Sequence, residues 1–327
     1  MSLTLIILIA LSLIFDYTNG MRDSSNIVAT MITSRAMTPR SALALTAIAE
    51  FVGPFIFGVA LAKTIGDEIV VPGSINMYVI IAALISAVVW NLLTWYLGLP
   101  SSSSHALIGG IIGSVVISVG WDKLLMAGVG KVLLALFLSP FIGFVMGFLV
   151  TRLVTLLCLS AHPKVNILFK RGQIFTALAL ALSHGTNDAQ KTMGIITMGL
   201  VTSGYLTEFV VPMWVIVLCA GVISIGTYMG GWKLIKTLGS KFYKMTPMDS
   251  FNIQLSSAFV ILGASLFGGP VSTTQVVSTA ILGVGSAERM NKVRWGVAGE
   301  IVIAWLLTIP ATGLLGGAVY WIILLFT

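Results

Sequence analysis

The sequence predicts an all-α membrane protein with several bilayer crossings, built from two related halves. Of the 327 residues, 57% are hydrophobic and only 9% are charged, whereas a soluble domain has about 25% charged residues. Apolar stretches recur from one end of the chain to the other, and two motifs each occur twice in the same order. Because lipid does not solvate charge, a chain of this composition belongs in a bilayer.

Ten stretches are apolar enough to form crossings, since a spanning helix needs about 20 mostly apolar residues. Those of the first half are 3–33, 42–63, 76–97, 99–119 and 124–159, and those of the second half are 172–202, 211–232, 252–269, 270–286 and 295–326. Pro140 interrupts the long stretch 124–159, which we expect to be one kinked helix or two shorter helices.

The first apolar stretch lacks the basic segment and the small-residue cleavage site of a signal peptide, so we interpret it as the first helix.

The two halves are joined by a short segment. The predicted organisation is a first repeat at 1–160, a short cytoplasmic connection at 161–171 and a second repeat at 172–327.

Basic residues gather in every second loop. They are Arg35, Arg40, Lys164, Lys170, Arg171, Lys233, Lys236, Lys241, Lys244, Arg289, Lys292 and Arg294, whereas Asp67, Glu68, Asp122 and Glu208 mark the loops between them. Because cytoplasmic loops are rich in Lys and Arg, we expect ten crossings with both termini outside, in a multi-pass protein of the cell inner (plasma) membrane. The net charge of +7 comes from these loops and not from a nucleic-acid-binding face.

The internal repeat sets the predicted architecture. The segment TNGMRDSSN at 18–26 matches SHGTNDAQK at 183–191 with an offset of 165, and LPSSSSH at 99–105 matches GPVSTTQ at 269–275 with an offset of 170. Two motifs in the same order at nearly one spacing indicate a duplication. Because each half has an odd number of crossings, the second half is expected to be inverted, with interrupted helices or hairpins at the midplane as in alternating-access transporters.

The first repeated motif places a carboxylate inside an apolar stretch of each half. Asp23 and Asp188 each cost several kcal/mol there unless they are paired or face water. Oxygen-rich sites suit hard cations, so we predict cation sites built from Asp23 with Asn26 and from Asp188 with Asn187. The alternative is a buried carboxylate that caps an unwound helical turn.

The second repeated motif has the composition of a helix start within the membrane. Pro and Ser or Thr are favoured in the first turn, and the free backbone N–H groups there attract anions. Two such starts would form a two-sided cradle for an oxyanion such as phosphate; the alternative is that the hydroxyls only cap the helices or pack between them. The predicted phosphate-binding residues are Ser102, Ser103, Ser104, Gln190, Ser272, Thr273, Thr274 and Gln275.

Other polar residues in apolar stretches are weaker candidates. His105 and His184 flank the motifs, and we expect them to support the site rather than to form it. An interhelical hydrogen bond explains each of the remaining positions at least as well as a role in transport. These possible coupling or cavity residues are Arg22, Glu50, Asn91 and Gln254.

Four segments carry a family resemblance: FDYTNGMRDSSNIVATMITSRA, GLPSSSSHALIG, SHGTNDAQKTMG and GGPVSTTQ. They resemble the inorganic phosphate transporter (PiT) family, which includes sodium-coupled and proton-coupled members, and they lie in both halves of the chain. The family's duplicated signature most often reads Gly-x-Asn-Asp-x-x-Asn. Here Arg22 replaces the first Asn in one copy and Lys191 the last Asn in the other, while Gln254 stands where many relatives have Glu.

The resemblance implies a secondary active symporter that moves inorganic phosphate across the membrane with a cation by alternating access. Sodium is the expected cation, at the cation-binding residues named above, and a proton is the other cation used in the family. The expected partners are phosphate, the cation and the lipid bilayer, with no nucleic acid and no enzymatic cofactor; a homodimer is left open.

Three alternatives remain. A sulfate or other oxyanion permease of the same fold would share the cradle. Phosphate near neutral pH also carries a proton, so an acceptor such as Gln190, Gln275 or a nearby carboxylate would favour phosphate over sulfate. A passive channel would need no cation. An intramembrane hydrolase would use Ser104 with His105 or Ser183 with His184, but adjacent residues do not face each other on a helix and no Gly-x-Ser-x-Gly elbow occurs. The chain is therefore predicted not to be an enzyme.

Overall fold

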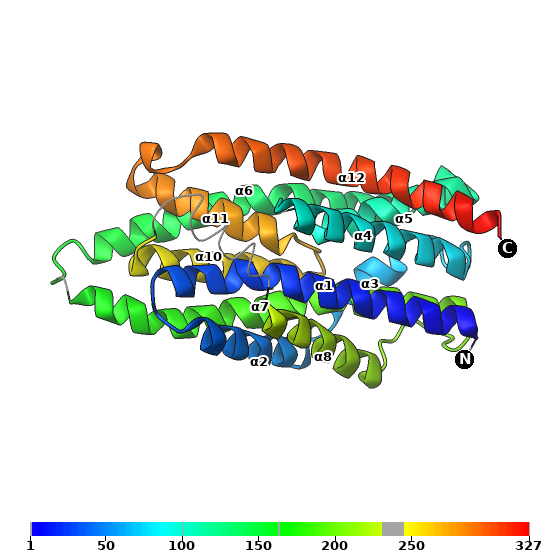
Figure 1. The fold of residues 1–327 in the computed structure, drawn as a ribbon, viewed down its shortest axis with the longest axis horizontal. Helices are drawn as coiled ribbons and strands as arrows, with labels where there is room; N and C mark the ends of the chain where they lie inside the picture. Colours follow the sequence, from blue (N-terminus) through cyan, green and yellow to red (C-terminus); the bar gives the residue numbers. More distant parts are fainter. Residues whose placement is uncertain (1, 100, 163, 231–244, 327) are drawn as a thin grey trace.

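The long helices run along one axis of an elongated bundle, and both termini lie at the same end of it (Figure 1). The structure is a computed structural model that describes residues 2–99, 101–162, 164–230 and 245–326, and within these ranges every regular element is a helix. The α-helices are α1 (Leu3–Thr33), α2 (Pro39–Phe57), α3 (Ala60–Asp67), α4 (Met77–Leu97), α5 (Ser103–Val119), α6 (Met126–Leu157), α7 (Val165–Thr202), α8 (Met213–Met229), α10 (Pro247–Leu266), α11 (Thr273–Glu288) and α12 (Trp295–Leu324).

The surface of the bundle is apolar. Phe141 is 66% exposed on α6 and Leu314 is 79% exposed on α12, and many other large apolar side chains share this exposure. Six of the described helices are long and apolar enough to cross a membrane, and α5 and α8 are shorter apolar helices. An apolar outer surface around a bundle of such helices fits a lipid environment, in which helices satisfy their own backbone groups.

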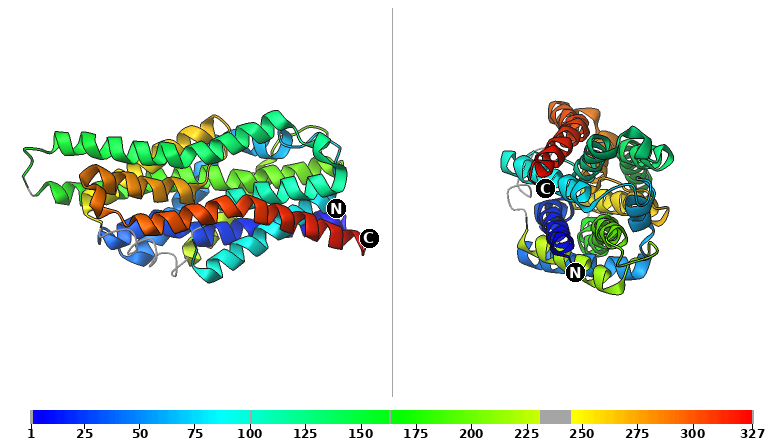
Figure 2. Two further views of the ribbon diagram at one scale, coloured as in Figure 1. Left: turned by 90° about the horizontal axis from the view of Figure 1, so that it is seen from above. Right: turned by 90° about the vertical axis from the view of Figure 1, so that its right-hand side faces the viewer.

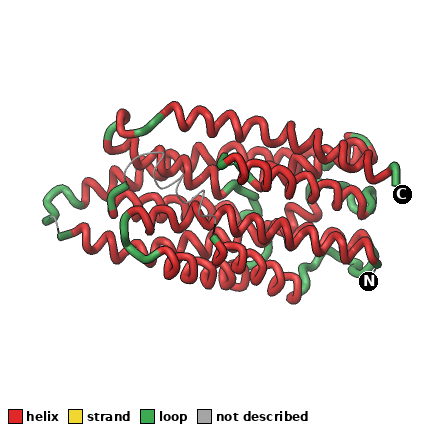
Figure 3. The backbone as a smooth tube through the Cα atoms, in the orientation of Figure 1, coloured by secondary structure: helices red, strands yellow, loops and turns green. Residues whose placement is uncertain are grey.

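Two helical hairpins, α4–α5 and α10–α11, turn back in the middle of the bundle. Loop segments therefore lie at its centre as well as at its ends (Figure 3). Gly113 of α5 packs against Gly313 in the second half of α12, and Gly283 of α11 packs against Phe144 in the second half of α6. A Cβ at Gly113 would lie 1.9 Å from the carbonyl oxygen of Gly313, so these close helix contacts require glycine.

The hairpins correct the predicted number of crossings. The stretches 76–97, 99–119, 252–269 and 270–286 were expected to cross separately, but they pair into two hairpins that enter from opposite ends (Figure 1). Helices α5 and α11 have only 17 and 16 residues, fewer than the roughly 20 that a crossing needs. A hairpin returns to the end of the bundle at which it entered, as a pair of crossings also does. Replacing two crossings by one hairpin therefore does not change the end at which any of the remaining loops lies.

The ends of the bundle differ in charge. The loops α1–α2, α6–α7 and α11–α12 lie at one end, and the loops α3–α4, α5–α6 and α7–α8 lie at the other, together with the termini (Figures 1 and 2). The first end carries Arg35, Arg40, Lys164, Lys170, Arg171, Arg289, Lys292 and Arg294, with Asp249 and Glu288 paired to Lys292. The second end carries Asp67, Glu68, Asp122 and Glu208, and there Lys123 pairs with Asp122 and Lys131 with Glu68. The predicted cluster of Lys233, Lys236, Lys241 and Lys244 lies outside the described residues.

The expected helix 42–63 is broken at Gly58. This residue has φ +78°, a conformation that favours glycine, and it follows Pro54, which lies inside α2. The new helix α3 begins at the exposed Ala60, but the next residues, Leu61 and Ala62, are buried, so their N–H groups need partners within the protein. The side-chain oxygen of Gln190 accepts hydrogen bonds from the N–H groups of Leu61 at 2.8 Å and Ala62 at 3.2 Å.

Helices α1 and α7 run without interruption through the signature motifs, so the expected interruption occurs in the hairpins and not here. The signature glycines instead let neighbouring backbones approach. A Cβ at Gly20 would lie 2.2 Å from the carbonyl oxygen of Ile223, and one at Gly185 would lie 2.3 Å from that of Glu50. Helix α6 is also one helix through Pro140, and α7 begins at Val165, earlier than the expected 172.

The two halves exchange packing partners. Helix α5 packs on α12 and α11 packs on α6, while α1 packs on α8 and α7 packs on α2. The end-on view shows the helices of both halves interleaved rather than separated into two bodies (Figure 2). This exchange brings the middle of α1, the middle of α7 and the tips of both hairpins to the centre of the bundle.

Candidate functional site

The two signature aspartates meet at the start of α11. The hydroxyl of Thr273 lies 3.2 Å from a carboxylate oxygen of Asp23 on α1 and 3.2 Å from one of Asp188 on α7. The hydroxyl of Thr274 donates to the other oxygen of Asp23 at 2.9 Å. Both carboxylates are buried. The two copies of the first motif and the second copy of the hairpin motif therefore form one cluster.

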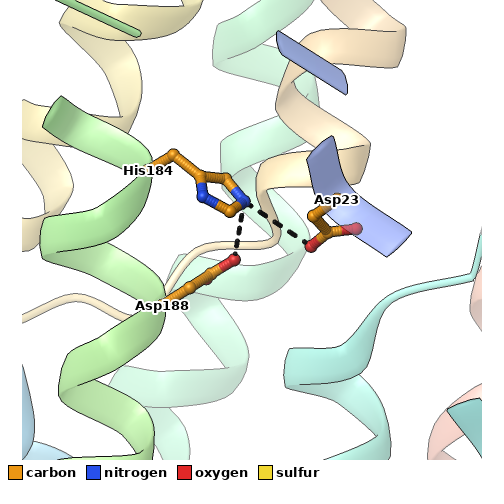
Figure 4. Close-up of side chains that lie close together, drawn as sticks. All are labelled: Asp23, His184 and Asp188. Atoms are coloured by element: carbon orange, nitrogen blue, oxygen red, sulfur yellow. Dashed lines mark ion pairs between the residues drawn. The ribbon is translucent and has the colours of Figure 1, made fainter. Parts of the chain in front are cut away.

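His184 connects three carboxylates. Its Nε2 lies 3.0 Å from Asp188 and 3.8 Å from Asp23 (Figure 4). Its Nδ1 lies 2.8 Å from Glu50 on α2. Glu50 also accepts a hydrogen bond of 2.5 Å from Thr227 on α8. One atom each of Asp23, His184 and Asp188 lie within 4.8 Å of one another, a grouping that can hold a cation. Sequence reasoning placed His184 beside the site, but the structure places it at the centre.

Lys191 is a second residue that the sequence analysis did not place in the site. Its ammonium is buried, with the residue 1% exposed, and it contacts the carboxylate of Asp188 in a short ion pair. It also donates to the hydroxyl of Ser104 at 2.6 Å and to the backbone carbonyl of Val271 at 3.1 Å. A signal was present in the sequence, because Lys three positions after Asp lies on the same face of a helix.

Arg22 lies next to Asp23 on α1 and contacts the first hairpin, α4–α5. Its guanidinium donates to the side-chain oxygen of Asn91 on α4 at 2.5 Å. It also donates to the carbonyl and the hydroxyl of Ser101 at 3.1 Å and 3.0 Å, and that hydroxyl bonds to Thr94 at 2.7 Å. The predicted residues Arg22 and Asn91 thus contact each other, and the arginine fixes the turn between α4 and α5.

The two predicted cation-binding amides differ. The side-chain oxygen of Asn187 accepts hydrogen bonds from Ser265 and from the backbone N–H of Val271, both at 3.3 Å. Asn26 donates to Thr274 at 3.0 Å, but its buried side-chain oxygen has no partner among the described residues. Of these two amide oxygens, that of Asn26 is the one without a partner in the described part of the chain.

The predicted hydroxyl residues lie at two buried helix starts. Ser102 caps α5, accepting from the N–H of His105 at 3.1 Å, and Ser272 caps α11, accepting from the N–H of Gln275 at 3.4 Å. The tips of the two hairpins touch, because Ser104 donates to the carbonyl of Val271 at 3.1 Å. The remaining hydroxyl residues of the prediction, Ser103, Ser104, Thr273 and Thr274, form the first turns of these helices and are buried.

Three predicted glutamines lie outside this cluster. The oxygen of Gln190 is engaged by the start of α3, as described above. Gln275 lines a cavity of about 290 Å³ between α6, α11 and α12, and its side-chain oxygen has no partner in the described part of the chain. Gln254 bonds to Thr176 at 2.6 Å and to Thr30 at 2.8 Å, so it ties α10 to α7 and α1. Local sequence does not show which helix face these side chains occupy once the bundle has formed.

A further buried carboxylate lies along α1. Asp16 precedes Asp23 by two helical turns, and its carboxylate is fully buried next to the hydroxyl of Thr192 on α7. The buried amide of Asn19, one helical turn further along α1, has no hydrogen-bond partner among the described residues. Asp16 is not among the predicted site residues, although it shares with Asp23 the signal of an Asp within an apolar stretch.

Comparisons with known proteins agree with this architecture. The sequence matches the phosphate transporter family over residues 19–316. It is 44% identical over 325 residues, 98% of this chain and 97% of the relative, to a probable low-affinity inorganic phosphate transporter of Bacillus subtilis. A protein of Rhizobium meliloti with the same description is 42% identical over 96% of this chain and 94% of the relative. A solved structure of a sodium-dependent phosphate transporter superimposes with a TM-score of 0.93 at 27% identity, covering 100% of both chains.

Proposed function

Because the chain belongs to the phosphate transporter family and is not an enzyme, we propose that it is a secondary active symporter that moves inorganic phosphate across the cell inner membrane together with sodium. One observation carries the proposal. Two hydroxyl-rich helix starts, one from each half, meet beside two aspartates, again one from each half. The groups that we propose for the anion and those that we propose for the cation are thus in direct contact.

The anion part of the site consists of the first turns of α5 and α11. The positive ends of two helix dipoles, free backbone N–H groups and hydroxyl donors favour a tetrahedral oxyanion. Hydrogen bonds to a charged group contribute about 1.5–3 kcal/mol each. Phosphate would be held by Ser102, Ser103, Ser104, Ser272, Thr273 and Thr274.

The cation part consists of the carboxylates and the unsatisfied oxygen of Asn26. A sodium ion there would be held by Asp23, Asn26 and the hydroxyl of Thr274, all within one hydrogen-bonded group. Without a bound cation, the carboxylates of Asp23 and Asp188 would repel a phosphate at the adjacent helix starts. A bound cation removes that repulsion. Each ligand therefore raises the affinity for the other by the same factor, which is the coupling that symport requires.

Matched contacts support two inverted repeats, 1–160 and 172–327, and transport by alternating access. The signature glycine of each half packs on the second helix of the other half, through Gly20 with Ile223 and Gly185 with Glu50. The signature motif repeats with an offset of 165 residues and the hairpin motif with an offset of 170. The two hairpins enter the bundle from opposite ends (Figure 1). Such a pseudo-twofold arrangement around a central site can open to either side in turn.

The proposal is tested with purified protein in proteoliposomes. We expect radiolabelled phosphate to accumulate when a sodium gradient is imposed and not when a proton gradient alone is imposed. Accumulation under a proton gradient alone would replace sodium with a proton as the coupling ion. Uptake that never exceeds equilibrium would identify a passive channel and contradict symport.

A further inference from the structure

The ammonium of Lys191 is bound as a free cation would be bound. Its partners are the carboxylate of Asp188, the hydroxyl of Ser104 and the backbone carbonyl of Val271, which come from three different elements. A buried charge is tolerated only when it is paired and hydrogen-bonded, and this one is. Carboxylate, hydroxyl and carbonyl oxygens are also the ligands that hard cations take from proteins.

The repeat assigns an equivalent position in the first half. With the offset of 165 between the signature motifs, Lys191 corresponds to Asn26 and Asp188 corresponds to Asp23. Asn26 carries no charge, and among the described residues no Lys or Arg lies within ion-pair distance of Asp23. The second aspartate therefore has an ammonium of its own, whereas the first has only the imidazole of His184 at 3.8 Å, which it shares with Asp188 at 3.0 Å.

The contacts of the two positions match as well. With the offset of 170 between the hairpin motifs, Ser104 corresponds to Thr274. Lys191 donates to Ser104, and Asn26 donates to Thr274. Both side chains therefore reach the hairpin of the opposite half at the equivalent hydroxyl, but only Asn26 presents an unsatisfied oxygen there.

Arg22 is not the counterpart of Lys191. It corresponds to Asn187, and the two occupy equivalent places. Arg22 donates to the carbonyl of Ser101, and Asn187 donates to that of the equivalent residue Val271, both at 3.1 Å. The position of the Lys191 ammonium has no basic side chain in the first half.

We propose that the ammonium of Lys191 is a built-in cation that permanently fills the cation site of the second half, so that one travelling sodium binds, at Asp23 and Asn26. This inference rests on the proposed sodium symport. The fixed charge neutralises Asp188 in every state of the cycle, and it leaves the phosphate site less repulsive even before sodium arrives. The sodium-to-phosphate ratio of the protein is then one.

Lys191→Asn tests the assignment, because it gives the second half the amide that the first half has. Radioactive sodium binding to the purified protein and the ratio of sodium to phosphate uptake in proteoliposomes are measured. We expect bound sodium per protein and the uptake ratio each to rise by one, and sodium activation to become sigmoidal. Lys131→Asn is the matched control, since Lys131 pairs with Glu68 at the end of the bundle, and it should keep the wild-type ratio.

The reciprocal variant Asn26→Lys covers the case in which Lys191→Asn does not fold. It places an ammonium in the remaining site, so sodium binding should be lost and phosphate binding should become independent of sodium. The inference is overturned if Asn26→Lys binds sodium at the wild-type level or if the sodium count of Lys191→Asn is unchanged. In that case, sodium-driven phosphate uptake by the wild type still upholds the proposed function. A wild type that neither binds sodium nor responds to a sodium gradient overturns both.

Discussion

The two copies of the signature motif have the same fold but different electrostatics. Each copy contributes one buried aspartate and one basic residue, yet Arg22 precedes its aspartate whereas Lys191 follows the other by three positions. Arg22 holds the turn of a hairpin through Asn91 and Ser101, while Lys191 pairs directly with Asp188. A duplicated motif can thus keep its backbone geometry while the aspartate of one copy is neutralised by a Lys of the same helix and the other, which we propose to bind sodium, is not.

The largest expected effect tests the neutralised copy. Asp188→Asn leaves the ammonium of Lys191 buried without a counter-charge, which should lower the free energy of unfolding by about 3–5 kcal/mol. Thermal unfolding in detergent measures this. The double variant Asp188→Asn with Lys191→Met should recover most of the loss, because it removes the orphaned charge. If the single variant is as stable as the wild type, the ion pair does not carry the stability that the structure assigns to it.

The ion-binding copy should respond through sodium rather than through stability. Asp23→Asn removes the charged ligand but leaves no buried cation unpaired. We expect the unfolding temperature to change little and the sodium concentration for half-maximal phosphate uptake to rise about a hundredfold, roughly 2.7 kcal/mol. An unchanged sodium dependence would remove Asp23 from the cation site and make the two aspartates equivalent.

The two helix starts can be compared by removing one hydroxyl from each. Thr273→Ala and Ser103→Ala should each weaken phosphate binding by about 0.5–3 kcal/mol for a lost hydrogen bond, as measured by equilibrium binding at saturating sodium. Thr273 also contacts both aspartates, so only its replacement should shift the sodium dependence as well. Normal phosphate binding by both variants would show that the oxyanion lies elsewhere.

The smallest effect concerns the choice of anion. Phosphate and arsenate should compete equally for uptake, whereas sulfate should compete poorly. Phosphate carries a proton that nearby acceptors in the site can bind, and sulfate lacks this proton. Inhibition of radiolabelled phosphate uptake by each anion measures this. Equal competition by sulfate would support an oxyanion permease of the same fold and leave the comparison of the two cation sites intact.

Much of the centre could be predicted from the sequence, because polar groups in apolar helices must find one another. Asp23, Asp188 and the hydroxyl residues of the hairpin starts lie where that reasoning placed them. The number of crossings could not be predicted from charge, since a hairpin and two crossings put the next loop on the same side. His184 and Gln190 were misjudged because their partners, Glu50 and the start of α3, are distant in sequence and become neighbours only when α2 and α3 pack on α7.

The exchange of partners between the halves also constrains the order of assembly during synthesis. The glycine face of α5, at Gly109 and Gly113, packs on residues of α12 such as Gly313, and α12 is synthesised only after α6, α7, α8, α10 and α11. The first hairpin therefore waits, without its main partner, until α12 has been made. Domains usually fold one after another as they emerge, but here neither half can complete its packing alone. A chain that ends before residue 295 would keep that glycine face uncovered.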